Sequence, residues 1–177
     1  MIDPEATKRF MAAPWLGEVD PDGKRAILEA LVEGRASAGA ILLEQDQPND
    51  HLSFLIQGTA QIERTFENGR REVITAIAAP TVFGTTSFFR PDPPSVAVRA
   101  TSEVWTLSLY HPEHEALRRE NPRAAEALAV AILRALSERF DLMDKLLSDY
   151  ISRHGGVSSR TSEWAGFRAR LFDESGV

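Results

Sequence analysis

The sequence contains no cysteine and no long hydrophobic run. Without cysteine the chain forms no disulfide, holds no thiolate zinc site and uses no cysteine nucleophile. No stretch reaches the length of a membrane-spanning helix, and charged residues occur throughout the first thirty positions, so a signal peptide is not expected. These absences predict a cytoplasmic protein that has no membrane partner.

Positive charge is also in short supply. The 20 lysine and arginine residues are outnumbered by 26 aspartate and glutamate residues, which gives a net charge of -6. An acidic balance argues against nucleic acid as the main partner. The 177 residues, 43% of them hydrophobic and 26% charged, are typical of one globular domain with a sizeable core and a tail.

Motifs of catalysis and metal binding are missing as well. The segment His111-Pro112-Glu113-His114 lacks the spacing of the helical zinc motif. Glu18, Asp20 and Asp22 lack the later ligands of a calcium loop, and no serine lies in a nucleophile elbow. We therefore expect no enzyme activity, no catalytic residue and no metal site.

What is present begins with helical sequence and continues with short strands. Residues 5–33 have apolar side chains at helical spacing, and Asp20-Pro21 is a typical helix start. Residues 35–109 alternate between short apolar segments and turns, and Asn68-Gly69 is the strongest hairpin signal. Many short strands at regular spacing predict a β-sandwich or a small barrel.

The last large element is a long helix. It begins at Asn121-Pro122, and residues 123–151 contain neither glycine nor proline. Packing against the β domain accounts for its first turns, whereas its second half is expected to meet a partner, and we favour homodimerisation. The predicted seam consists of Leu136, Phe140, Met143, Leu147 and Tyr150. Residues 152–160 then resemble a flexible linker, and 162–172 are compatible with one short amphipathic helix.

Residues 82–101 are the most informative segment. Phe83-Gly84 ends an apolar run, Ser87-Phe88-Phe89 is compatible with one helical turn, and Ser95 to Ala100 resumes a strand after a proline-rich loop. A glycine followed by short hydroxyl side chains and a helical turn offers backbone N–H groups to an anion. The prolines of the loop, in contrast, remove such donors.

In this segment the chain resembles the cyclic-nucleotide-binding domain of catabolite-activator-type regulators and of cyclic-AMP-dependent kinase regulatory subunits. The family pattern is Phe-Gly-Glu-Leu-(Ser/Ala), a loop, and Arg-(Ser/Thr)-Ala before a strand. The resemblance places the family's ribose-binding glutamate at Thr85 and its phosphate-binding arginine at Pro94. The chain keeps other residues of the pattern: Phe83, Gly84, Ser87, Ser95, Val98 and Ala100.

Further segments extend the resemblance over roughly residues 10 to 150. They are Gly39-Ala40-Ile41-Leu42, the stretch from Leu52 to Gly58, and the hairpin from Phe66 to Val73, whereas Gln45 and Pro80 stand where the family has glycines. The resemblance implies a mainly β protein with flanking helices, a jelly-roll β-roll. The predicted parts are an N-terminal helical segment (1–34), the β-roll (35–120), the long helix (121–151) and a tail (152–177).

The resemblance implies a regulatory module and leaves its mode of action open. We call positions 85 and 94, where the family has its ribose-binding glutamate and phosphate-binding arginine, the gripping positions. Because Thr85 and Pro94 replace both residues, we expect contacts with a protein partner and weak or no binding of cyclic nucleotides, so no cofactor is expected. The alternative is a small-molecule sensor whose pocket is refitted for a different ligand, or for a cyclic nucleotide that Arg90 holds in place of the lost arginine. The ligand positions of that alternative are Phe83, Gly84, Thr85, Thr86, Ser87, Arg90, Ser95 and Val96. A transcription regulator is a third hypothesis, but too few residues follow the long helix for a helix-turn-helix domain.

Overall fold

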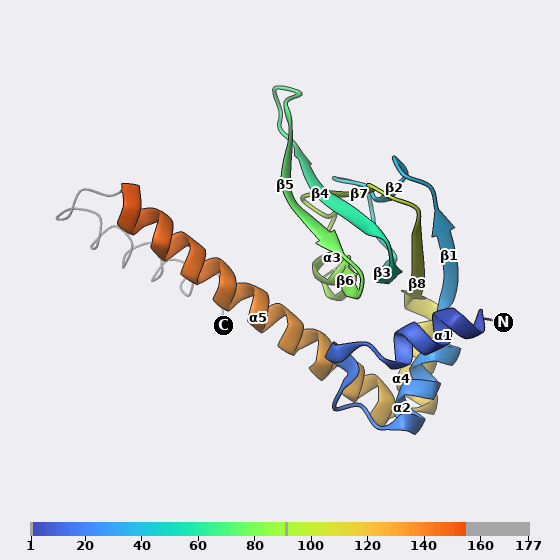
Figure 1. Cartoon of the computed structure of the whole chain (residues 1–177). Helices are drawn as coiled ribbons and strands as arrows, with labels where there is room; N and C mark the ends of the chain where they lie inside the picture. Colours follow the sequence, from blue (N-terminus) through green and yellow to red (C-terminus); the bar gives the residue numbers. More distant parts are fainter. Residues whose placement is uncertain (1, 91, 155–177) are drawn as a thin grey trace. The chain divides into compact units, whose positions relative to one another are not determined.

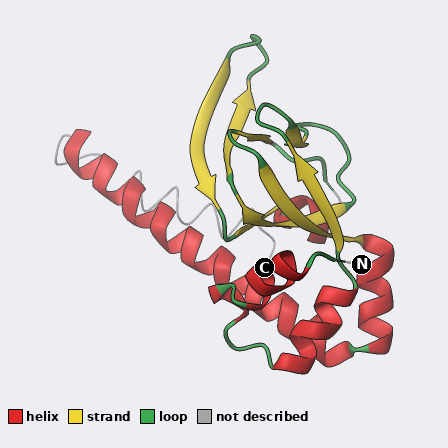
Figure 2. Ribbon diagram, turned by 45° about the vertical axis from the view of Figure 1, so that its right-hand side comes forward, coloured by secondary structure: helices red, strands yellow, loops and turns green. Residues whose placement is uncertain are grey.

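The computed structural model describes residues 2–90 and 92–154, and its central part is a roll of two four-stranded antiparallel sheets. The strand orders are β1-β8-β3-β6 and β2-β7-β4-β5, which confirms the predicted jelly-roll β-roll (Figures 1 and 2). The strands are β1 (Val32–Ala36), β2 (Ile41–Leu43), β3 (His51–Gln57), β4 (Thr59–Thr65), β5 (Arg71–Ala78), β6 (Thr81–Phe83), β7 (Ala97–Ala100) and β8 (Val104–Tyr110).

The space between the two sheets is filled by apolar side chains. Strand pairing sets which residues face it, because Ile62 lies opposite Val98 and Ala60 opposite Ala100 in the β4–β7 ladder. Residues that alternate with these therefore point to the outer face of the second sheet. The buried cluster consists of Leu43, Leu55, Ala60, Phe83, Val98, Ala100 and Val104.

Helices gather at one end of the roll in both views (Figures 1 and 2). Among them are α1 (Pro4–Met11), a 3₁₀ turn (Pro14–Leu16) and α2 (Pro21–Glu29). Two aromatic rings of this segment pack on Phe54 of β3, Phe10 at 5.5 Å and Trp15 stacked at 4.7 Å. The N-terminal segment thus covers the face of the first sheet that points away from the roll interior.

Two element boundaries differ from the sequence prediction. β1 begins at Val32, so the expectation of helix as far as residue 34 is wrong over its last residues. Val32 is opposite Ser108 of β8, and this pairing between distant segments is what makes the stretch a strand. Residues 111–120, assigned to the roll from the sequence, form the helix α4 (His111–Glu120).

The long helix α5 (Pro122–His154) begins and ends close to its predicted limits. Ser152 to His154 are helical, so the expectation of a linker from residue 152 is wrong at its start; the rest of the tail, 155–177, lies outside the described residues. Within residues 2–90 and 92–154, no helix combines the length and the hydropathy that crossing a membrane requires.

By its internal contacts the chain forms two units, Met1–Leu133 and Arg134–Val177. In the first unit, one face of the early turns of α5 is buried, including Leu128 and Ile132. In the second unit, Phe140 and Met143 expose 51% and 54% of their surface and Leu136 is half-buried. The side chains of Leu147 and Tyr150, the remaining predicted seam residues, lie outside the described part.

Candidate functional site

The segment between β6 and β7 turns sharply at Gly84. The φ angle of Gly84 is +78°, a conformation that residues with a Cβ rarely adopt. A Cβ at this position would also lie 3.0 Å from the carbonyl oxygen of His51. Both the conformation and the close approach of β3 therefore require glycine, and the turn leads directly into the short helix α3 (Thr85–Phe89).

Asn49 ties this turn to the loop before β3. Its side-chain Nδ2 donates hydrogen bonds to the carbonyl oxygen of His51 at 2.7 Å and to the Ser87 hydroxyl at 2.9 Å. The Ser87 hydroxyl in turn donates to the carbonyl oxygen of Gly84 at 3.3 Å. Asn49 could not be predicted from the sequence, because an asparagine in a turn indicates a local hydrogen bond and says nothing about a residue 38 positions away.

Five of the predicted ligand positions come together in this turn. Phe83, Thr85 and Ser87 are buried, and Thr85, the position that the resemblance gives to a glutamate, exposes only 5% of its surface. Thr86 is exposed and Gly84 is half-buried. The buried side chains of the turn are therefore neutral, and the Ser87 hydroxyl bonds to the Gly84 carbonyl oxygen and to Asn49.

The loop after α3 carries no arginine into the turn. Pro94, at the position that the resemblance gives to the phosphate-binding arginine, is buried, and its carbonyl oxygen accepts a hydrogen bond from the Asp46 amide at 2.8 Å. The side chain of Arg90 is 85% exposed and forms an ion pair with Asp92. The structure thus separates Arg90 from the buried residues of the turn.

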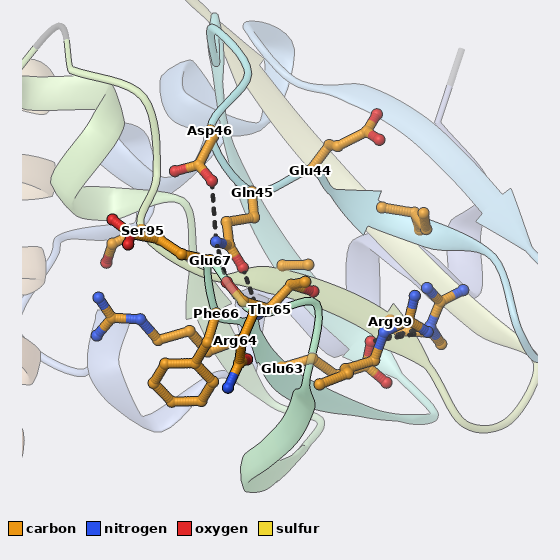
Figure 3. Close-up of a pocket in the computed structure, with 14 residues that line it drawn as sticks. Glu44, Gln45, Asp46, Glu63, Arg64, Thr65, Phe66, Glu67, Ser95 and Arg99 are labelled. Carbon is orange, nitrogen blue, oxygen red and sulfur yellow. Dashed lines mark hydrogen bonds and ion pairs between the residues drawn. The ribbon is translucent and has the colours of Figure 1, made fainter.

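The last two predicted positions lie beyond the loop. Ser95 is exposed, and Val96 is half-buried just before β7. Ser95 lines a cavity of about 800 Å³ together with residues of β2, β4 and β7 and of the β4–β5 hairpin (Figure 3). The register places this cavity on the outer face of the second sheet, because the strand residues that line it alternate with core residues.

A buried ion pair forms part of the wall of this outer cavity. Glu63 is only 4% exposed, and its Oε2 lies 3.1 Å from the Nε of Arg99, while Arg71 stands farther away at 3.9 Å. A second guanidinium nitrogen of Arg99 donates to the carbonyl oxygen of Gly39 at 2.8 Å. These contacts leave the side chain of Arg99 only 22% exposed.

The electrostatics of Glu63 follow from these neighbours. Burial alone raises the pKa of Glu63, but hydrogen bonds from Gln61 and Arg99 and the charges of Arg99 and Arg71 outweigh burial and lower it. Glu63 therefore stays ionised and compensated by its own sheet. The sequence shows that Glu63 and Arg99 carry opposite charges, but only the β4–β7 register brings the two side chains into contact.

Gln45 closes one side of the same cavity. Its side-chain amide accepts a hydrogen bond from the Thr65 amide at 2.7 Å and donates one to the Thr65 carbonyl at 2.8 Å, as Figure 3 shows. Gln45 stands where the resemblance expects a glycine, but the left-handed residue of this turn is Asp46, with a φ angle of +60°. A side chain at position 45 is therefore compatible with the turn.

A comparison with protein families agrees with this geometry. Residues 33–121, half of the chain, match the model of the cyclic nucleotide-binding domain. The chain belongs to the cyclic nucleotide-binding domain family. The Gly84 turn, α3 and the loop to β7 are the segment in which the sequence resembles the family's phosphate-binding pattern, and we call residues 84–96 the cassette below.

Curated and structural relatives fit this membership. A CRP-like cAMP-activated global transcriptional regulator of Mycobacterium tuberculosis is 27% identical over 136 residues, which are 75% of this chain and 58% of the relative. The chain thus spans less than two thirds of the curated relatives it matches. The N-terminal domain of a transcriptional regulator from Streptomyces coelicolor A3(2) has a TM-score of 0.64 at 24% identity, covering 75% of this chain and 95% of that one.

A cyclic nucleotide-binding domain from Methylobacillus flagellatus KT shares the fold more closely. Its TM-score is 0.73 at 16% identity, and the match covers 82% of this chain and 84% of the other. The curated relatives are regulators rather than enzymes. In the described part of the chain, no three or more acidic or histidine side chains are grouped to hold a metal ion.

Proposed function

We propose that this chain is a regulatory module that acts through protein contacts and binds standard cyclic nucleotides weakly or not at all. The observation that carries the proposal is the neutral interior of the cassette, where Thr85 and Pro94 are buried at the two gripping positions. Removing one partner of a buried, hydrogen-bonded charge pair costs about 2–5 kcal/mol. Each loss weakens binding by roughly thirtyfold to several thousandfold.

Isothermal titration of the full chain with cyclic AMP and cyclic GMP, up to millimolar concentration, tests this proposal. We expect no binding heat in the micromolar range. The double variant Thr85→Glu, Pro94→Arg restores the charged grip and is expected to gain measurable affinity for a cyclic nucleotide. The matched control Thr86→Glu, Ser95→Arg places the same charges on exposed neighbours and is expected to gain none.

The alternative proposal is a small-molecule sensor with a refitted pocket. The hydrogen bonds from Asn49 that hold the Gly84 turn support it, because they keep the cassette backbone in place without a ligand. Micromolar binding of a cyclic nucleotide by the wild-type chain, lost on Arg90→Ala, would favour the sensor over the first proposal. Binding that survives Arg90→Ala would contradict the first proposal and leave the phosphate contact to other groups.

Homodimerisation through α5 is part of the first proposal. Phe140 and Met143 support it, since each exposes more than half of its surface and they lie three residues apart, on neighbouring turns of one helix face. Sedimentation of the full chain is expected to show a dimer that dissociates in Phe140→Glu, Met143→Glu. Lys145→Glu is the control, because it introduces a carboxylate at an exposed position that is not one of the apolar seam residues. This variant should keep the dimer. A wild-type monomer at high micromolar concentration contradicts this part.

A further inference from the structure

Four rings join the end of the cassette helix α3 to the first turn of α4. The ring of Phe88 stacks on that of His111, with centroids 4.4 Å apart and planes inclined by 3°. His114, one turn further along α4, lies 5.3 Å from Phe88 and 5.9 Å from Phe89 in edge-to-face geometry. Phe88 is buried, so this contact is part of the packed interior between the two helices.

Both ends of this contact are anchored. On one side, α3 starts at Gly84 and is held through Ser87 by Asn49. On the other side, α4 follows β8 without a gap, and the backbone amide of His111 donates to the carbonyl oxygen of Asp50 at 3.1 Å. α4 leads into α5 after a single residue, so the rings lie between the cassette helix and the helix that precedes α5.

The charged groups around the imidazole of His114 come mainly from its own helix. They are Glu115, Arg118 and His111. From α3 only the two phenyl rings reach it, and the next titratable residue of that segment, Arg90, is paired with Asp92.

The strand β8 ends at Tyr110, directly before α4. Tyr110 lies against His51, at 5.1 Å between rings, and His51 is hydrogen-bonded to Asp50 at 2.9 Å. These groups form a separate pair, so the protonation of His114 is governed by burial and by α4.

Two effects oppose each other when His114 takes up a proton. Attraction between an imidazolium and a phenyl ring favours the charged form. Burial disfavours it, because the imidazolium loses hydration, and the positive charge of Arg118 adds repulsion. Burial lowers the pKa of His114 below its ordinary 6.5, Arg118 and His111 lower it further, and Glu115 offsets only part of this. The neutral ring therefore fits the contact better.

We propose that the contact of Phe88 and Phe89 with His111 and His114 is a proton-sensitive latch, closed while His114 is neutral and loosened when His114 is protonated. The inference goes beyond the proposed function, because it holds whether or not the cassette binds a ligand. The latch gives the cassette helix and α4 a joint response to acid, as the pH falls through the lowered pKa of His114.

Nuclear magnetic resonance of the full chain between pH 7.5 and 5.0 tests the latch. The imidazole of His114 is expected to titrate with a midpoint below 6.5. The backbone amides of residues 86–89 should shift with the same midpoint, and their hydrogen exchange, corrected for intrinsic pH dependence, should rise at least threefold at the acid end. A midpoint of His114 at or above 6.5, or amides of α3 that ignore its titration, overturns the proposal.

Substitutions separate the latch from a general acid effect. His114→Phe keeps an aromatic ring and removes the proton site, so the amides of α3 should lose their pH response. His51→Gln removes another histidine outside the latch and should leave that response intact. If His114→Phe folds poorly, the wild-type titration still decides. A wild-type-like α3 response in His114→Phe rejects the latch.

Discussion

The cassette and the outer face of the second sheet differ in buried charge: the cassette has none at its gripping positions, and the outer face has an ion pair. In the cassette, the positions that the family resemblance gives to a charged grip hold Thr85 and Pro94, and both are neutral and buried. On the outer face, Glu63 is equally buried and fully ionised, because Arg99 stands on the neighbouring strand. Buried charge in this protein is found where the fold itself supplies the counter-charge, and it is missing where only a ligand would supply it.

This contrast has a consequence for the unliganded protein. A glutamate and an arginine in an empty cassette leave desolvated groups without partners, which destabilises the fold until a ligand binds. Thr85 and Pro94 avoid that cost. The neutral cassette is therefore compatible with a module that keeps one structure at all ligand concentrations, as a protein-binding role requires.

The largest loss of stability is expected when the buried Glu63 carboxylate on the outer face loses its partner Arg99. Arg99→Leu leaves the Glu63 carboxylate buried, with only the more distant Arg71 nearby, and should lower the free energy of unfolding by about 3 kcal/mol. Urea denaturation measures the loss. Arg9→Leu breaks the exposed helical pair with Glu5 and, as the control, should cost less than about 0.5 kcal/mol. Equal losses in the two variants would contradict the comparison.

Arg99→Leu also tests how the stability contributed by the Glu63–Arg99 ion pair depends on pH. The folded pKa of Glu63 lies below its ordinary 4.5, so its ion pair adds stability that is fully present above pH 4.5 and is lost as the pH falls through the lower folded value. The stability difference between wild type and Arg99→Leu should therefore be constant from pH 5 to 7 and shrink below pH 4.5. A difference that grows in acid would contradict the assigned partner.

A medium effect is expected from the backbone of the cassette. Gly84→Ala combines a positive φ angle with a close approach to the His51 carbonyl and should lower the free energy of unfolding by about 2–3 kcal/mol. Gly69→Ala has nearly the same φ angle with open space around it, and should cost only about 1 kcal/mol. The difference between the two variants isolates the close approach, and thermal unfolding measures it.

The smallest effect is expected from the side chain that holds the cassette. Asn49→Ala removes two hydrogen bonds and leaves the His51 carbonyl oxygen without this donor, at a cost of about 1–2 kcal/mol. Asn68→Ala removes one exposed bond in the hairpin turn and should cost less than half as much. A local readout, the amide exchange of α3, should rise in the Asn49 variant and stay unchanged in the Asn68 variant.

Much of the fold could be predicted from the sequence because the signals are local. Alternation along β4, the Asn68-Gly69 turn and the long helix without glycine or proline each act within a few residues. The first strand was missed for the opposite reason. Val32 to Ala36 lack strong alternation, and their strand conformation depends on pairing with β8, about seventy residues later.

The candidate site was predictable in part. The sequence indicated Gly84, the helical turn after it and the two altered gripping positions, since these form one contiguous pattern. The direction of Arg90 and the link from Asn49 to Ser87 could not be predicted, because neither follows a local period. An exposed arginine and a buried one look alike in sequence, as Arg90 and Arg99 show.

The hairpin at Asn68-Gly69, the long helix and the glycine at the cassette turn followed from the sequence alone, since local conformational preference and hydrophobic period are properties of neighbouring residues. The two altered gripping positions followed from the family resemblance. Only the tertiary structure decided which charges meet and which are buried. The pairing of Glu63 with Arg99 and the stacking of Phe88 on His111 depend on strand register and helix docking, which bring together residues far apart in the chain. Those contacts set the electrostatics of the protein, because a charge is stabilised by its neighbours in space.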